Sequence, residues 1–176
     1  MNASVSLPRD KAAAPAPVRP SAGRRRALIG CALAVAAPGL AVAQFRSVRA
    51  GPLVEVWKSP TCGCCKDWIE HMEAAGFRIE VNDSGNAGAR ARLGIAQKFG
   101  SCHTALVDGY AIEGHVPASD VRRLLEERPE AVGLAVPGMP IGSPGMDGPA
   151  YGGRRDPYEV LLLQADGTAA VYRSYR

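Results

Sequence analysis

Several features are scarce or missing in this sequence of 176 residues. Aromatic residues make up 6% of the chain, no internal repeat is visible, and no apolar run is long enough to cross a bilayer twice. These absences argue against a repeat array and against a multi-span membrane protein. The length and the hydrophobic fraction of 47% are instead typical of one compact domain with a processed tail.

The N-terminal segment has the three parts of an export signal. A basic stretch from Arg24 to Arg26 precedes an apolar stretch that runs to about residue 40, and the small residues Ala41 and Ala43 follow. A signal peptidase reads small residues at this spacing. We therefore expect cleavage after Ala43 and export to the periplasm, and the arginine pair leaves both the Sec and the Tat route open.

Cleavage would remove the excess of basic residues. Residues 1–43 hold six basic residues and one acidic residue, a net charge of +5, whereas the whole chain carries +4, so the mature protein would be near −1. No basic stripe with interleaved aromatic residues is left, which disfavours a nucleic-acid partner. We expect a linker over residues 44–52, one domain over residues 53–176 and no membrane span after cleavage.

The mature chain would keep four of the five cysteines. These are Cys62, Cys64, Cys65 and Cys102. In an oxidising compartment such thiols form disulfides unless a metal binds them or a partner keeps them reduced. The sequence therefore points to thiol chemistry or metal binding.

Hydrophobic periodicity and turn residues predict the first half of the domain. The run over residues 52–59 predicts a strand, and a helix should begin at the cysteines and end at Ala75, because Gly76 follows. Residues 77–81 alternate between apolar and charged side chains and predict a half-buried strand. A second helix is expected over residues 87–100. Its predicted inner face consists of Leu93, Ala96 and Phe99.

The next part of the chain predicts a hairpin and a helix. Strands over residues 104–107 and 110–113 flank an Asp108-Gly109 turn. A third helix should start at Pro117 and end before Pro129.

The remaining residues extend this plan. Residues 129–157 are rich in glycine and proline, and so long a loop is either functional or loosely ordered. A second hairpin around Asp166-Gly167 closes the chain. The order of elements indicates an α/β protein with a thioredoxin-like three-layer fold and an added C-terminal β-hairpin. Such folds keep their active site at the turn from the first strand to the first helix, where Cys62 lies.

Cys62 and Cys65 are three residues apart at a helix start, so their side chains share one helix face. They can form a disulfide or bind one metal ion, and the helix N-terminus should favour the Cys62 thiolate. In a thiol–disulfide oxidoreductase Cys62 would attack and Cys65 would resolve; an inert structural disulfide is the alternative. Neither role uses Cys64, whose side chain points elsewhere on the helix.

Cys102 and His103 lie just before the predicted third strand. In a thioredoxin-like fold this loop, usually marked by a proline that is missing here, abuts the cysteine turn. We therefore expect Cys102 and His103 to converge on the first three cysteines. Such a sulfur-rich cluster suits Cu(I), with more than one ion, and Zn(II) is the alternative metal. A disulfide between Cys64 and Cys102 is the competing interpretation.

Other candidate ligands have structural alternatives. Met139 and Met146 are weak candidate Cu(I) ligands from the long loop, or apolar residues that anchor the loop to the core. His71, on the first helix, is expected to be a solvated or core residue rather than a ligand. His115 is expected to be a hydrogen-bonded residue at a strand boundary.

Three stretches of the chain, SPTCGCCKDWIEHM, SCHTALVDGYAIEGHVP and AVPGMPIGSPGM, resemble the CopG-like family of exported copper-resistance proteins. The similarity extends from about Val54 to Tyr175. The resemblance implies a thioredoxin-like fold that carries a copper cluster bridged by cysteines. The ligands that it implies are Cys62, Cys64, Cys65, Cys102 and His103.

The leading hypothesis is an exported copper-binding protein that holds Cu(I) in a thiolate cluster and passes between metal-loaded and disulfide states in copper tolerance. Its partners would be copper ions and, among proteins, copper chaperones or efflux components. The alternatives are a thiol–disulfide oxidoreductase that uses Cys62 and Cys65, and a zinc-binding interaction module. Cys64 distinguishes them, because a pure oxidoreductase should tolerate its loss.

Overall fold

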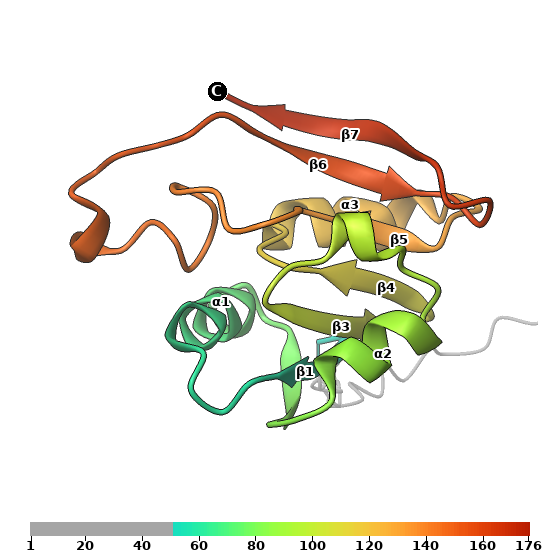
Figure 1. Ribbon diagram of the computed structural model, residues 1–176, viewed down its shortest axis with the longest axis horizontal. Helices are drawn as coiled ribbons and strands as arrows, with labels where there is room; N and C mark the ends of the chain where they lie inside the picture. The colour runs from blue at the N-terminus through green and yellow to red at the C-terminus, as the bar shows by residue number, and fades with distance from the viewer. Residues whose placement is uncertain (1–50) are drawn as a thin grey trace, which may run out of the picture. The chain divides into compact units, whose positions relative to one another are not determined.

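The computed structural model describes residues 51–176 (Figure 1). The predicted signal peptide, its cleavage site and most of the predicted linker therefore lie outside the described residues.

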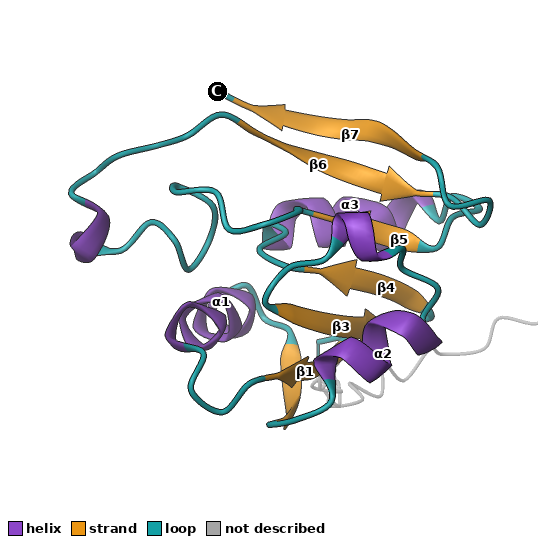
Figure 2. Ribbon diagram, in the orientation of Figure 1, coloured by secondary structure: helices purple, strands orange, loops and turns teal. Residues whose placement is uncertain are grey.

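One mixed sheet of seven strands organises the described part of the chain (Figure 2). Its strand order is β2-β1-β3-β4-β5-β6-β7. The β1/β2 and β4/β5 pairs are parallel and the other neighbours are antiparallel. The strands are β1 (Leu53–Lys58), β2 (Arg78–Asn82), β3 (His103–Val107), β4 (Tyr110–Glu113), β5 (Gly133–Ala135), β6 (Tyr158–Leu163) and β7 (Ala169–Tyr175).

Helices lie on both faces of this sheet. The α-helices are α1 (Gly63–Ala74), α2 (Asn86–Arg92) and α3 (Ala118–Glu127), and the short 3₁₀ helices are η1 (Gln97–Phe99) and η2 (Pro149–Tyr151). On one face, Trp68 of α1 and Leu124 of α3 share a buried core with Ile112 of β4. On the other face, Ile95 packs with Ala111 of β4. Because neighbouring strand residues point to opposite faces, the two cores are separate and the fold has three layers.

The predicted order of elements is confirmed, and so are the α/β class and the added C-terminal hairpin. Helix α1 ends one residue before the predicted position, and Gly76 has a φ of 88°. The β3–β4 turn places Asp108 at φ 46° and Gly109 at φ 87°, the pair of positive values that a two-residue hairpin turn favours. The C-terminal hairpin pairs β6 with β7 and joins the main sheet through β5.

The predicted second helix is wrong in its length. Helix α2 ends at Arg92, and Gly94 follows with a φ of 75°, so the helix cannot continue to residue 100. Ala89 in α2 is 0% exposed, and Ile95, beyond the end of the helix, is 5% exposed. The predicted inner face, Leu93, Ala96 and Phe99, is only partly buried.

Two further expectations need correction. Val81 of β2 is 44% exposed, because β2 is the edge strand of the sheet and its alternation does not produce a buried face at every position. The loop over residues 129–157 contains strand β5, whose buried residues include Leu134 and Ala135. Beyond β5 the chain runs toward the N-terminal end of α1 before it returns to β6 (Figure 1).

Candidate metal centre

The cysteine turn, residues 59–65, joins β1 to α1. Cys62 is the last residue before the helix, and its N–H donates a hydrogen bond to the Ser59 carbonyl at 3.1 Å. Cys62 and Cys65 form a disulfide with their Cα atoms 5.4 Å apart. Cys64 is a half-buried free thiol whose Sγ lies 3.7 Å from Cys62 Sγ. The turn therefore presents an oxidised pair and one additional thiol.

The Cys102 loop, residues 100–103, meets the cysteine turn at one end of the sheet. Strands β1 and β3 are antiparallel and pair Lys58 with His103, so the residues after β1 and before β3 are neighbours. Cys102 is a second free thiol, and the competing Cys64–Cys102 disulfide is not formed. The predicted convergence is confirmed for Cys102, because one sulfur from each of four cysteines lies within 4.8 Å of the others, whereas His103 is grouped with Cys102 and His115 and not with the first three cysteines. That these sulfurs bind a metal stays a prediction.

Two imidazoles extend the cluster behind Cys102. His103 Nδ1 lies 3.5 Å and His115 Nε2 lies 3.0 Å from Cys102 Sγ. Both histidines are fully buried. Cys102, His103 and His115 offer three donor atoms within 4.8 Å of one another.

The sequence predicts His115 only as a boundary residue, whereas the structure also groups it with Cys102 and His103. The register of the predicted hairpin could have indicated this position. The hairpin turn at residues 108 and 109 sets a register in which Thr104 pairs with Glu113. Continuing that register by two residues places Cys102 opposite His115. His115 also makes a hydrogen bond, as expected for a residue at a strand boundary. It therefore combines this structural contact with a position beside the Cys102 sulfur.

The hydrogen bonds of His115 define its tautomer. Nδ1 lies 2.7 Å from the Pro144 carbonyl oxygen. A carbonyl oxygen only accepts, so Nδ1 carries the proton and the Nε2 lone pair faces the Cys102 sulfur. Metal-binding histidines are commonly oriented in this way, with the second ring nitrogen donating to a backbone carbonyl.

Burial sets the protonation of these groups. Burial and then the neighbouring His115 lower the pKa of His103 well below its usual range, and burial also lowers the pKa of His115. Burial and then the nearby Cys64 raise the pKa of Cys102 to about 12. The imidazoles are therefore neutral and available as donors at neutral pH, whereas a metal must displace the thiol proton of Cys102.

The two methionines of the long loop have different surroundings. Met139 is 51% exposed, and its Sδ lies 3.9 Å from Cys64 Sγ at the outer side of the cluster. Met146 is 9% exposed, and its Sδ accepts a hydrogen bond from the Tyr151 hydroxyl at 3.2 Å. This contact favours the anchoring role for Met146, while Met139 faces a cysteine of the cluster.

His71 has a structural contact away from the sulfurs. Its Nε2 accepts a hydrogen bond from the Ala118 N–H at 3.1 Å, in the first turn of α3. Burial lowers its pKa, with a smaller opposing effect of Asp147. His71 therefore ties α1 to α3, in agreement with the structural role expected for it.

The long loop packs closely on the helix that carries the cysteines. Gly145 has a φ of 83°, and a Cβ at this position would lie 2.5 Å from the Cys64 carbonyl oxygen. Trp68 is fully buried and donates a hydrogen bond from Nε1 to the Val116 carbonyl at 2.9 Å. Its ring packs against His103 with the ring centroids 4.3 Å apart and the planes tilted by 42°. Trp68 therefore belongs to the core, and its ring also covers the imidazole side of the cluster.

The donor atoms of this centre suit a soft metal. The two groups supply sulfur and imidazole nitrogen and contain no carboxylate. Among buried side-chain nitrogen and oxygen atoms of residues 51–176, His103 Nε2 is the one without a hydrogen-bond partner. Thiolates and imidazoles favour Cu(I) or Zn(II) over Mg²⁺ or Ca²⁺. The residues present therefore fit a copper site.

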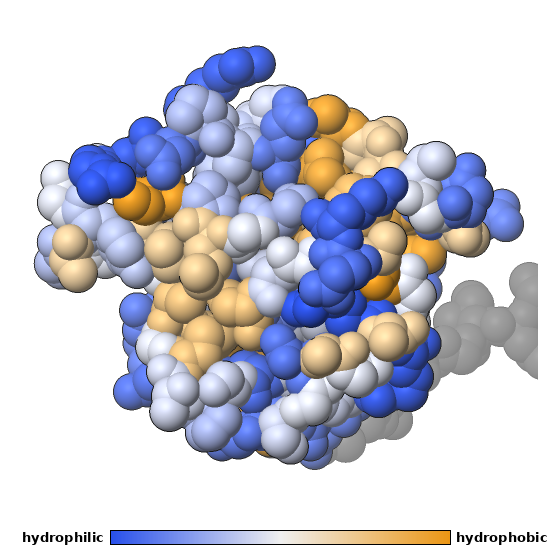
Figure 3. Space-filling view, viewed as in Figure 1, coloured by the Kyte–Doolittle hydropathy of each residue, from blue (hydrophilic) through white to orange (hydrophobic). Residues whose placement is uncertain are grey.

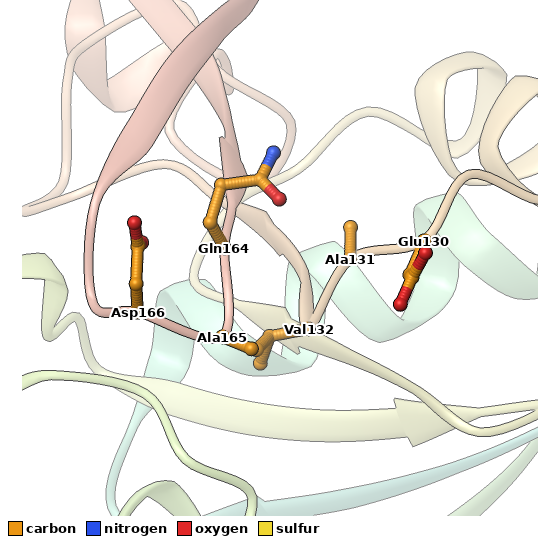
Figure 4. Close-up of a pocket in the computed structure, with 6 residues that line it drawn as sticks. All are labelled: Glu130, Ala131, Val132, Gln164, Ala165 and Asp166. Carbon is orange, nitrogen blue, oxygen red and sulfur yellow. The ribbon is translucent and has the colours of Figure 1, made fainter.

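A separate pocket lies elsewhere on the molecule (Figure 4). It has a volume of about 460 Å³ and lies between the segment before β5 and the β6–β7 turn. The lining residues are Glu130, Ala131, Val132, Gln164, Ala165 and Asp166. They include no thiol, thioether or imidazole, so this pocket is unrelated to the soft-metal chemistry.

Among the helices of residues 51–176, none combines the length and the apolar character that crossing a membrane requires.

The comparisons with known proteins point to copper resistance. A family model described as "Protein of unknown function, DUF411" matches residues 99–146, a range that includes Cys102 and His115. The search of curated proteins finds no match to this chain. A solved structure described as "Copper resistance protein copG- Form 2" is 45% identical, with a TM-score of 0.66, over 72% of this chain and 99% of that chain.

A second structure, described as "Copper resistance protein copG- Form 1", is 46% identical, with a TM-score of 0.65, over 70% of this chain and 96% of that chain. Identity at this level over nearly the whole length of both relatives leaves one conclusion: the chain belongs to the CopG family of copper resistance proteins.

Proposed function

We propose that this protein is an exported copper-binding protein that holds Cu(I) in a cluster of cysteine thiolates and contributes to copper resistance. The observation that carries the proposal is the convergence of four sulfurs within 4.8 Å at the junction of the cysteine turn and the Cys102 loop. The membership of the CopG family supports copper as the metal, and the predicted signal peptide supports export to the periplasm. Copper chaperones or efflux components would supply or remove the ion.

More than one Cu(I) ion suits this arrangement. Cys64 and Cys65 are adjacent in sequence and Cys102 approaches from another segment, so thiolates can bridge ions held by different residues. His115 and His103 would supply nitrogen ligands on the buried side. Met139 would supply a thioether on the exposed side.

The Cys62–Cys65 disulfide gives the site a redox-dependent state. Opening it requires two electrons and two protons from a dithiol donor and yields two thiols. Cu(I) then replaces the thiol protons of the cluster. In the disulfide state the four-cysteine cluster keeps two free thiols, those of Cys64 and Cys102, so oxidation should favour copper release.

The test is metal analysis of the protein expressed from the full chain and purified without oxygen. Wild type should carry more than one copper per chain, and both Cys64→Ser and Cys102→Ser should lose most of it. Met146→Leu is the matched control, since this sulfur is engaged by Tyr151. A wild type that carries zinc in place of copper would replace the proposal by the zinc-binding module.

A thiol–disulfide oxidoreductase is the second candidate. The Cys62–Cys65 disulfide at the start of α1 favours it, because Cys62 is partly exposed at the helix N-terminus, where its sulfur is accessible to exchange, while Cys65 is buried. In that case Cys64→Ser would keep disulfide-reductase activity and the wild type would hold no copper. Loss of copper in Cys64→Ser, with no reductase activity in the wild type, would exclude this candidate.

A further inference from the structure

A buried carboxylate holds the backbone of the Cys102 loop from behind. Glu113 is 0% exposed, and its Oε1 accepts a hydrogen bond from the Ser101 N–H at 2.6 Å. Its Oε2 accepts a hydrogen bond from the Thr104 hydroxyl at 2.7 Å. Glu113 therefore contacts the chain on both sides of Cys102.

The ion-pair partner of this carboxylate binds the other backbone polar group of Ser101. Arg90 of α2 is 7% exposed and donates from Nε to Glu113 at 2.9 Å. Its second terminal nitrogen donates to the Ser101 carbonyl at 2.6 Å. Both backbone hydrogen-bonding groups of Ser101 are thus bound by one buried ion pair.

A third side chain binds Cys102 itself. Asn86 donates from its amide nitrogen to the Cys102 carbonyl at 3.2 Å. Asn86 and Arg90 are four residues apart on α2, so they lie on the same helix face. One face of α2 and the last residue of β4 therefore hold the residues on either side of the Cys102 thiol.

The cost of this arrangement indicates that it does more than fill the core. Burying an ion pair carries a large desolvation penalty, and apolar residues of similar volume frequently stabilise a fold as well or better. The Cys102 sulfur, in contrast, lies 3.0 Å from His115 Nε2 and within 4.8 Å of three other sulfurs, and a metal bound by these groups would need them held together. Ligand geometry of this kind tolerates little displacement.

We propose that Asn86, Arg90 and Glu113 form a positioning clamp that fixes the Cys102 sulfur for metal capture. The clamp rests on the proposed function for its purpose. Its three residues touch no metal ligand side chain through their own hydrogen bonds; they act through the backbone of residues 101 and 102. They are positioning residues.

The test replaces the ion pair by apolar residues in the double variant Arg90→Met/Glu113→Leu. The matched control is Asp120→Leu/Arg173→Met, which removes an ion pair between α3 and β7 whose carboxylate is also 0% exposed. Thermal unfolding first establishes that both proteins fold. Cu(I) affinity is then measured by competition with a chromogenic Cu(I) chelator, and iodoacetamide alkylation of Cys102 is followed by mass spectrometry in the disulfide state.

The clamp variant should bind Cu(I) about 10- to 100-fold more weakly, the range found when residues that support metal ligands are changed. Its Cys102 should be alkylated faster than in wild type, and the control should match wild type in both measurements. Wild-type affinity together with wild-type alkylation in the clamp variant would overturn the proposal.

Failure of the clamp can be distinguished from failure of the proposed function and from misfolding of the variant. If wild type binds no Cu(I), the proposed function is wrong, and the alkylation rate of Cys102 alone decides the clamp. If the double variant does not fold, Asn86→Ala decides, since it removes the donor to Cys102 and leaves the ion pair intact. We expect weaker Cu(I) binding and faster alkylation in Asn86→Ala, and no change in either would overturn the clamp.

Discussion

The two halves of the candidate metal centre, the cysteine turn and the Cys102 loop, are held in different ways. In the cysteine turn, no side chain caps α1, Ser59 and Thr61 share an exposed hydroxyl contact at 3.1 Å, and a disulfide provides the main link. In the Cys102 loop, buried side chains bind the backbone, and His115 binds the sulfur. The first half is connected covalently and the second by a buried polar network.

The difference shows how one site can combine redox change with fixed geometry. Reduction of the disulfide changes two sulfurs of the cysteine turn, one of which, Cys65 Sγ, lies 3.8 Å from the Cys102 carbonyl oxygen. The ion pair that holds the Cys102 loop contains neither sulfur. The loop can therefore serve as the constant part of the site while the turn changes its ligands.

The molecular surface in the view of Figure 3 mixes hydrophilic and apolar residues. Met139 is among the large apolar side chains that are exposed.

The largest expected effect comes from breaking the buried half. Glu113→Ala leaves the Arg90 guanidinium buried without its partner and should lower the free energy of unfolding by about 3–5 kcal/mol. The corresponding change beside the cysteine turn is Asp83→Ala, which removes the ion pair of Lys58 with a carboxylate that is 61% exposed and should cost about 1 kcal/mol or less. Urea unfolding measures the loss of stability in both variants. Equal losses in Glu113→Ala and Asp83→Ala would contradict the difference between the two halves of the site.

The next effect concerns the nitrogen ligands. His115→Gln should weaken Cu(I) binding by about tenfold or more, because the imidazole nitrogen beside Cys102 is lost. His71→Gln is the control, since His71 contacts Ala118 and no sulfur. Competition titration with a Cu(I) chelator measures both, and an unchanged affinity in His115→Gln would limit the centre to its sulfurs.

A smaller effect should appear as pH falls. His71 has a pKa below its ordinary value of 6.5, because burial disfavours the charged ring and its Nε2 must stay unprotonated to accept from Ala118. Its contribution is therefore present above pH 6.5 and is lost as pH falls from 6.5 through the lowered pKa. A hydrogen bond of this kind contributes about 1 kcal/mol.

Urea unfolding of wild type and His71→Gln between pH 7.5 and pH 5 would measure this contribution, because only the wild type titrates at this position. The stability difference between the two proteins should shrink on acidification. A difference that is constant across this range would show that His71 does not titrate in this way.

The smallest effect should come from the exposed thioether. Met139→Leu should weaken Cu(I) binding by about 1 kcal/mol or less, which is at most about fivefold, because Met139 reaches the cluster through Cys64 alone. Met146→Leu should leave the affinity unchanged, since its sulfur is bound by Tyr151. A larger loss in Met146→Leu than in Met139→Leu would reverse the assignment of the two methionines.

Much of the site could be read from local sequence patterns. The start of α1 at the cysteines, the Asp108-Gly109 hairpin and the expectation that Cys102 approaches the turn all hold in the structure. His115 was missed, although the hairpin register pointed to it. The Arg90–Glu113 pair had no signal at all, because a charged residue in a short helix is ordinarily solvated and only tertiary contacts reveal its burial.

Strand β5, which the sequence did not predict, also depends on tertiary contacts that leave no local signal. β5 has three residues, begins with Gly133 and lies in a segment of glycine and proline. A Cβ at Gly133 would lie 1.8 Å from the Ala111 carbonyl oxygen, so the close approach of β4 requires glycine there. A glycine in such a segment predicts a loop, because the sequence does not show which strand packs against it.

The sequence by itself determined the elements other than β5, their order and the residue types of the candidate metal centre, since backbone preferences and periodicity act within a few residues. Only the tertiary structure decided which donor atoms meet, that Met146 is occupied by Tyr151, and that a buried ion pair holds the loop of Cys102. These features depend on contacts between segments far apart in the chain. Their free energy comes from burial and from paired polar groups, which no local pattern records.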